Sequence, residues 1–143
     1  MLNYLKNLFN IIKKEENSDA VHAFAKPVLY SLESDISKIG SSFDSIKHLV
    51  DSGFRIGFDK IPSVELGDLV EKLKEFSAVV EASPAGNRIR VTSLLAKMHD
   101  SAVKCSGLSA FLVDSSEPDI NFSQILSCFN DIKLSFKEVC ALF

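Results

Sequence analysis

The sequence predicts an all-α protein: an antiparallel four-helix bundle with heptad-patterned helices, preceded by an N-terminal amphipathic helix. Apolar residues recur at alternating spacings of three and four in four long segments, a period that a strand cannot produce. Prolines and short turn signals separate these segments. Hydrophobic residues make up 46% and charged residues 24% of the 143 residues, which is enough for one domain with its own core.

The first bundle helix is expected over residues 27–51, where Gly53 would end it. Its apolar seam consists of Leu29, Leu32, Ile36, Ile39, Phe43, Ile46 and Val50. In the connection that follows, Phe54, Ile56 and Phe58 alternate with polar residues. This alternation allows a short strand, but a single strand has no partner, so we favour a loop folded over the end of the bundle.

The second helix is expected to start at Ser63, a suitable N-cap residue, and to end at the turn formed by residues 83–86. Its seam consists of Leu66, Leu69, Leu73, Phe76 and Val80.

The third helix is expected over residues 88–113. Its seam consists of Val91, Leu95, Met98, Ala102, Cys105 and Leu112. Ser109 interrupts this seam, and Gly107 weakens the helix by roughly 1 kcal/mol. We therefore expect Leu108 and Phe111, which lie beside the seam, to supply the packing there.

The fourth helix is expected to open with a capping box formed by Asn121 and Gln124, after a loop over residues 115–119. Its seam consists of Phe122, Ile125, Phe129, Ile132, Phe136, Val139 and Phe143. Similar helix lengths and short connections favour an up-down-up-down bundle over residues 19–143. The same spacing is also typical of a coiled coil between chains, so the sequence leaves open whether the seams close within one chain.

Residues 1–16 predict an amphipathic helix that is separated from the bundle by the polar residues 17–19. Its apolar face carries Leu2, Leu5, Leu8, Phe9 and Ile12. Its opposite side carries Lys6, Lys13 and Lys14. Such a helix can pack on its own bundle, enter the groove of a protein partner or a second copy, or lie on a membrane surface. The order of elements resembles the layout of HeLo-type membrane-permeabilising domains, but no shared motif supports assignment to that family.

No pattern typical of a catalytic or cofactor-binding site is present, since the P-loop, GxSxG, HExxH and GxGxxG motifs are all missing. Asp44, His48 and Asp51 share one helix face and could hold a metal weakly, but a solvated polar face explains them better. The sequence therefore predicts no enzymatic activity, no metal, no cofactor and no small-molecule substrate.

A basic stripe runs beside the seam of the third segment. It consists of Arg88, Arg90, Lys97 and Lys104. The stripe could bind phosphate or an acidic partner, but we favour pairing with the acidic second segment, as flanking charges do in bundles. The net charge of −3 and the lack of aromatic residues within the stripe argue against nucleic-acid binding.

The function predicted from the sequence is that of a non-enzymatic protein-protein interaction module, such as an adaptor, a chaperone or an assembly subunit, with a protein partner or self-association. The alternative is a membrane-associating or membrane-perturbing bundle that acts through its N-terminal helix. Three cysteines without a CxxC spacing, and no signal peptide, indicate a cytoplasmic protein, peripheral to a membrane in the alternative.

Overall fold

The computed structural model describes residues 18–83, 86–113 and 115–143, with side chains from residue 25 onwards. This part of the chain is helical and contains no strand. Its elements are α2 (Ser18–Asp51), the short 3₁₀ helix η1 (Phe58–Lys60), α3 (Ser63–Glu81), α4 (Arg88–Leu112) and α5 (Pro118–Ala141). The predicted N-terminal helix lies outside the described residues.

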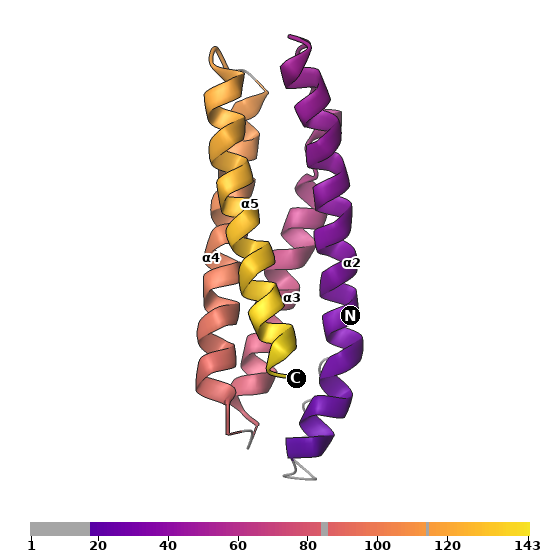
Figure 1. Cartoon of the computed structure of the whole chain (residues 1–143), viewed down its shortest axis with the longest axis vertical. Helices are drawn as coiled ribbons and strands as arrows, with labels where there is room; N and C mark the ends of the chain where they lie inside the picture. The colour runs from indigo at the N-terminus through magenta and orange to yellow at the C-terminus, as the bar shows by residue number, and fades with distance from the viewer. Residues whose placement is uncertain (1–17, 84–85, 114) are drawn as a thin grey trace.

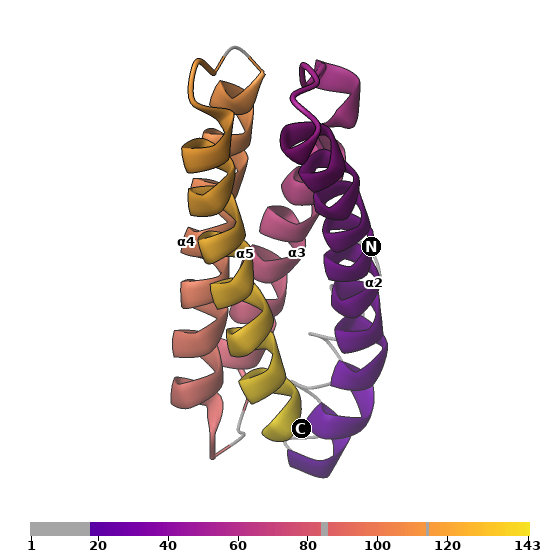
Figure 2. The same ribbon diagram turned by 45° about the horizontal axis from the view of Figure 1, so that its top comes forward.

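The four long helices pack against each other, as Figures 1 and 2 show. Helix α4 lies between α3 and α5 and contacts both extensively, whereas α2 contacts α3 and α5 less extensively. The α2–α3 and α4–α5 connections lie at the same end of the molecule (Figure 1). We call this end, formed by residues 51–65, 111–113 and 115–120, the loop end. The first residues of α2 and the last residues of α5 lie toward the opposite end.

All four long helices contribute to one hydrophobic core. Every residue of the three seams predicted for α2, α3 and α4 is buried. In α5 the predicted seam is also buried, except that Phe136 and Phe143 are only partly buried. Aromatic rings join α2 to α5, where Phe43 meets Phe129 edge to face with ring centroids 5.2 Å apart. The apolar spacing in the sequence therefore identified the faces that form the core.

Helix α2 is longer than predicted, since it continues N-terminally of Pro27 to Ser18. A proline inside a helix removes one backbone hydrogen bond and crowds the carbonyl four residues earlier, at a cost of about 3 kcal/mol. The ring of Pro27 is exposed, and the neighbouring Val28 and Leu29 are buried. The proline was thus the wrong marker for the start of this helix.

The predicted end of α2 at Gly53 is confirmed. Gly53 has a φ of 74°, a left-handed conformation that favours glycine. Its N–H donates to the carbonyl of Val50 at 3.1 Å, and the N–H of Phe54 donates to that of Leu49 at 2.9 Å. These two bonds form a Schellman motif, which satisfies carbonyls that the helix leaves without an internal partner.

Both predicted N-caps are wrong. Helix α3 begins at Ser63 itself, and the residue before it, Pro62, occupies the cap position. Helix α5 begins at Pro118 rather than after Asn121, because a proline in the first turn has no N–H to leave unpaired. Asn121 instead donates its side-chain N–H to the hydroxyl of Ser115, which also accepts the backbone N–H of Glu117 at 3.1 Å.

The packing predicted around Ser109 is also wrong in part. Ser109 is fully buried in the seam, where its hydroxyl donates to the carbonyl of Cys105 at 2.7 Å. This bond satisfies the hydroxyl on its own helix, so the seam passes through a serine without interruption. Leu108 is partly buried, but Phe111 is 74% exposed and does not contribute to the core.

Candidate binding surface at the loop end

The loop end carries more than half of the exposed large hydrophobic side chains among the described residues. They are Phe54 (66% exposed), Phe58 (70%), Val64 (73%), Phe111 (74%) and Ile120 (55%). Single exposed apolar residues are normal on a protein surface, but a group at one end marks a candidate interaction site. We refer to Phe54, Phe58 and Phe111 as the loop-end phenylalanines.

Two of these rings, Phe54 and Phe58, lie on either side of a buried residue in the connection between α2 and α3. The segment after Gly53 is not helical until η1, and in a regular strand Phe54, Ile56 and Phe58 would share one face, because they are spaced two residues apart. Ile56 instead turns inward and is 3% exposed, whereas Phe54 and Phe58 are exposed, so this segment does not have the geometry of a strand. The loop favoured for this connection is therefore confirmed, and the alternative short strand is not formed. The segment is a loop with a 3₁₀ turn, and Ile56 and Ile61 join the core.

A small hollow lies between the two connections of the loop end and is lined by residues of both. It measures about 180 Å³ and is lined by Phe54, Arg55, Ile56, Leu112, Val113, Ser115 and Pro118. Sites for small molecules usually enclose about 300–1,000 Å³, so this hollow suits one large side chain rather than a metabolite. The hollow brings together residues 54–56 with Leu112, Val113, Ser115 and Pro118, which lie far apart in the sequence.

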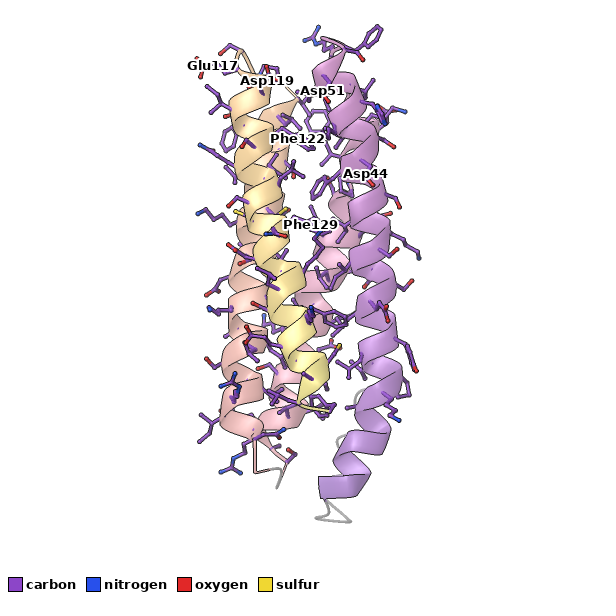
Figure 3. The ribbon with its side chains drawn as sticks, in the orientation of Figure 1. Asp44, Asp51, Glu117, Asp119, Phe122 and Phe129 are labelled. Carbon is purple, nitrogen blue, oxygen red and sulfur yellow. The ribbon has the colours of Figure 1, made fainter. Side chains whose placement is uncertain are left out.

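The loop end has an excess of negative charge. Its carboxylates, which we call the acidic rim, are Asp51, Asp59, Glu65, Glu117 and Asp119. Figure 3 shows Asp51 at the end of α2 and Glu117 and Asp119 at the start of α5. The cations at this end are Arg55 and Lys60, and Lys60 lies 3.9 Å from Asp59 in an exposed pair. The exposed rings and the carboxylates of the acidic rim therefore lie at the same end of the molecule.

The basic stripe runs along α4, and its last member, Lys104, lies on the same helix face as Phe111, two turns before it. Arg88 donates to the backbone carbonyl of Ser83 at 3.3 Å, and Arg90 lies 3.9 Å from Glu138 of α5. Lys97 and Lys104 are exposed. The stripe was predicted to pair with α3, but Arg90 lies beside Glu138 of α5 instead. A groove of about 560 Å³ runs along Arg90 and Lys97, between α4 and Glu138 of α5.

A polar contact that the sequence analysis missed joins α2 to α3. The ammonium of Lys72 donates to a carboxylate oxygen of Asp35 at 2.6 Å and to the hydroxyl of Ser31 at 3.0 Å. The Asp35 side chain is 9% exposed and that of Lys72 is 17% exposed. Each residue directly precedes a seam leucine or isoleucine, which is the only sequence signal that places it at a helix interface.

The thiols and the Asp44, His48 and Asp51 face are the reactive groups that the sequence offered. Burial and, to a lesser extent, Cys128 raise the pKa of the Cys105 thiol to about 12, so the reactive thiolate is disfavoured. Partial burial and then the charge of Glu33 also raise the pKa of Cys140. Asp44, His48 and Asp51 are all exposed. The described residues contain no group of three or more His, Cys, Asp or Glu that could hold a metal ion.

The fold and this surface define an all-helical protein of four packed helices with an exposed aromatic end. Within the described ranges, no helix has both the length and the apolar character needed to cross a membrane. Comparison with protein-family models, curated proteins and solved structures gives no match for this chain.

Proposed function

We propose that this chain is a non-enzymatic protein-protein interaction module, such as an adaptor, a chaperone or an assembly subunit, whose loop end contacts its partner. The exposure of the three loop-end phenylalanines, of which Phe54 lines a hollow that fits one side chain, carries this proposal. Full burial of such a side chain is worth about 1.5–3 kcal/mol, so the rings represent binding energy that the isolated chain does not use. Aromatic residues are also enriched in the central part of protein interfaces.

An antiparallel, heptad-packed bundle is part of the proposal, because it would hold both connections of the loop end on a rigid support. Contacts along the helices support this arrangement. Asn87, just before α4, donates its side-chain N–H to the carbonyl of Leu142, just after α5, at 2.9 Å. The start of α4 therefore lies beside the end of α5. Likewise, Glu33 in the first half of α2 acts on Cys140 near the end of α5.

The predicted N-terminal amphipathic helix is proposed as a second contact segment. Its apolar face and its lysines support this role, and the argument rests on the sequence alone. A reducing compartment such as the cytoplasm completes the proposal, since the three cysteines are free thiols.

A membrane surface is the second candidate partner, because exposed phenylalanines also insert into lipid. The charge of the loop end argues against it. Each basic residue near an anionic bilayer contributes about 1 kcal/mol, and each carboxylate opposes binding for the same reason. The five carboxylates of the acidic rim outnumber Arg55 and Lys60, so the loop end favours a protein partner.

The proposal is tested by comparing partner capture by the intact chain and by a variant with all three loop-end phenylalanines changed to serine. A matched control changes three exposed apolar residues elsewhere, Tyr30, Ile89 and Leu134, to serine. We expect the intact chain and the control to retain the same partner, and the loop-end variant to bind it at least tenfold more weakly. Equal capture by all three proteins, or binding of the intact chain to anionic vesicles in place of protein, would contradict the proposal.

A further inference from the structure

We propose that the loop end of one copy binds the N-terminal amphipathic segment, residues 1–14, of a second copy of this chain. The inference rests on the proposed function and names the partner of the same surface. Three arguments favour this segment as the partner of the loop end: its apolar fit, its charge and the distance that it can span.

The first argument is that the apolar face of the N-terminal segment matches the apolar surface of the loop end. An amphipathic helix binds by placing residues spaced three or four apart into a hydrophobic surface. Leu5, Leu8 and Phe9 have this spacing, with Leu2 and Ile12 on either side. The loop end offers exposed phenylalanine rings and a hollow of about 180 Å³, which can take one leucine or phenylalanine side chain.

Charge separates the loop end from the other grooves of the described chain. The N-terminal segment carries Lys6, Lys13 and Lys14. The acidic rim attracts these lysines, whereas the larger groove along α4 contains Arg90 and Lys97 and repels them. A third groove, between α3 and α4, contains cationic and acidic side chains such as Lys74 and Glu81, and no exposed large hydrophobic residue lines it.

Distance shows why the segment must come from a second copy. Helix α2 has 34 residues and is therefore about 50 Å long, and it ends at the loop end. If residues 1–14 form the predicted helix, they span about 21 Å. Residues 15–17 add at most about 10 Å. The segment of the same copy, which starts from Ser18 at the far end of α2, falls about 20 Å short of the loop end.

Binding in this way joins two different surfaces, so each copy can offer one surface to each of two neighbours. Such a head-to-tail contact leads to an open chain or a closed ring rather than to a two-fold dimer. This property allows a test by complementation between two variants of the full chain.

The first variant carries Leu5→Glu and Phe9→Glu, which remove the apolar face of the segment. The second variant carries the three loop-end Phe→Ser changes. We expect the wild type to form oligomers that grow with concentration in analytical ultracentrifugation, and each variant alone to be monomeric. An equimolar mixture should form a dimer and nothing larger, because it contains one intact segment and one intact loop end. The Tyr30, Ile89 and Leu134 control should assemble like the wild type.

A second pair of variants tests the charge argument without removing apolar residues. Lys13→Glu with Lys14→Glu should weaken wild-type assembly at least tenfold at low salt. Mixing this variant with a chain that carries Glu117→Lys and Asp119→Lys should restore a contact between the two chains. Circular dichroism of each variant confirms that the fold is retained.

The inference is overturned if the wild type remains monomeric at high concentration, or if it assembles while the two apolar variants fail to complement each other. It is also overturned if the Leu5→Glu, Phe9→Glu variant assembles alone. These outcomes differ from failure of the proposed function. A monomeric wild type that still captures another protein through the loop-end phenylalanines contradicts this inference and leaves the proposed function in place.

Discussion

An ion pair between Asp35 of α2 and Lys72 of α3 links the two helices, and Lys72→Met removes the cation from that pair. Methionine keeps an unbranched side chain of similar length, so it excludes water from the space that lysine occupied. The carboxylate of Asp35, only 9% exposed, then loses the ammonium that donates to it at 2.6 Å. Removing one member of a buried pair leaves an uncompensated charge, which costs about 3–5 kcal/mol.

Two features of the site reduce this cost. The Lys72 side chain is 17% exposed, so the pair is not fully removed from water. Ser31 lies one helical turn before Asp35 and can turn its hydroxyl to donate to the carboxylate, which recovers about 1 kcal/mol. We therefore expect Lys72→Met to lower the free energy of unfolding by about 2–3 kcal/mol.

Urea unfolding followed by circular dichroism at 222 nm measures this change. With a slope of about 1.5 kcal/mol per molar urea, the midpoint should fall by about 1.3–2 M. Lys74→Met is the matched control, because Lys74 lies on the same helix and is exposed, and it should change stability by no more than about 0.5 kcal/mol. The double variant Asp35→Leu, Lys72→Met should regain most of the loss, because it leaves no buried charge.

Hydrogen exchange locates the effect within the molecule. Because α2 contacts its neighbours less extensively than α4 does, its amides should lose protection first in the Lys72→Met variant. If Lys72→Met and Lys74→Met have equal stabilities, the pair does not hold α2 and the reasoning is refuted. A double variant as unstable as the single one would also refute it, because lost packing rather than an unpaired charge would then be the cause.

Four further predictions concern the backbone and the thiols. Gly53→Ala should cost about 1–2 kcal/mol in urea unfolding through backbone strain alone, since no atom lies within 4 Å of the added methyl group; unchanged stability would show that the turn relaxes. Pro27→Ala should raise the thermal midpoint by several degrees, because it restores a backbone hydrogen bond of α2 at an exposed position; a lower midpoint would contradict a continuous helix there. At pH 8 a thiol reagent should label Cys140 in the folded protein and Cys105, whose pKa is about 12, only after unfolding. Glu33→Gln removes a negative charge that raises the pKa of Cys140, so labelling of this thiol should become faster; an unchanged rate would exclude the contact.

The sequence alone determined the helical class and the buried face of each helix. Apolar spacing is a local property, and a helix with one apolar face must bury that face whatever its neighbours are. Gly53 was predictable for the same reason, since a left-handed residue after a helix is a local requirement. The local signals failed to locate two of the helix starts. A proline such as Pro27 is favoured in the first turn of a helix, yet here α2 passes through it. Helix α5 begins at Pro118 rather than at Asn121.

Only the tertiary structure decided which surfaces meet and which remain free. The spacing around Ser109 and Phe111 does not predict that the serine is buried and the phenylalanine exposed. The burial of each side chain depends on which helices pack against α4. Asp35 and Lys72 are 37 residues apart and become a pair only when α2 lies on α3. The loop end likewise gathers rings and carboxylates from two connections far apart in the sequence, and only the packing of four helices brings those connections to one end.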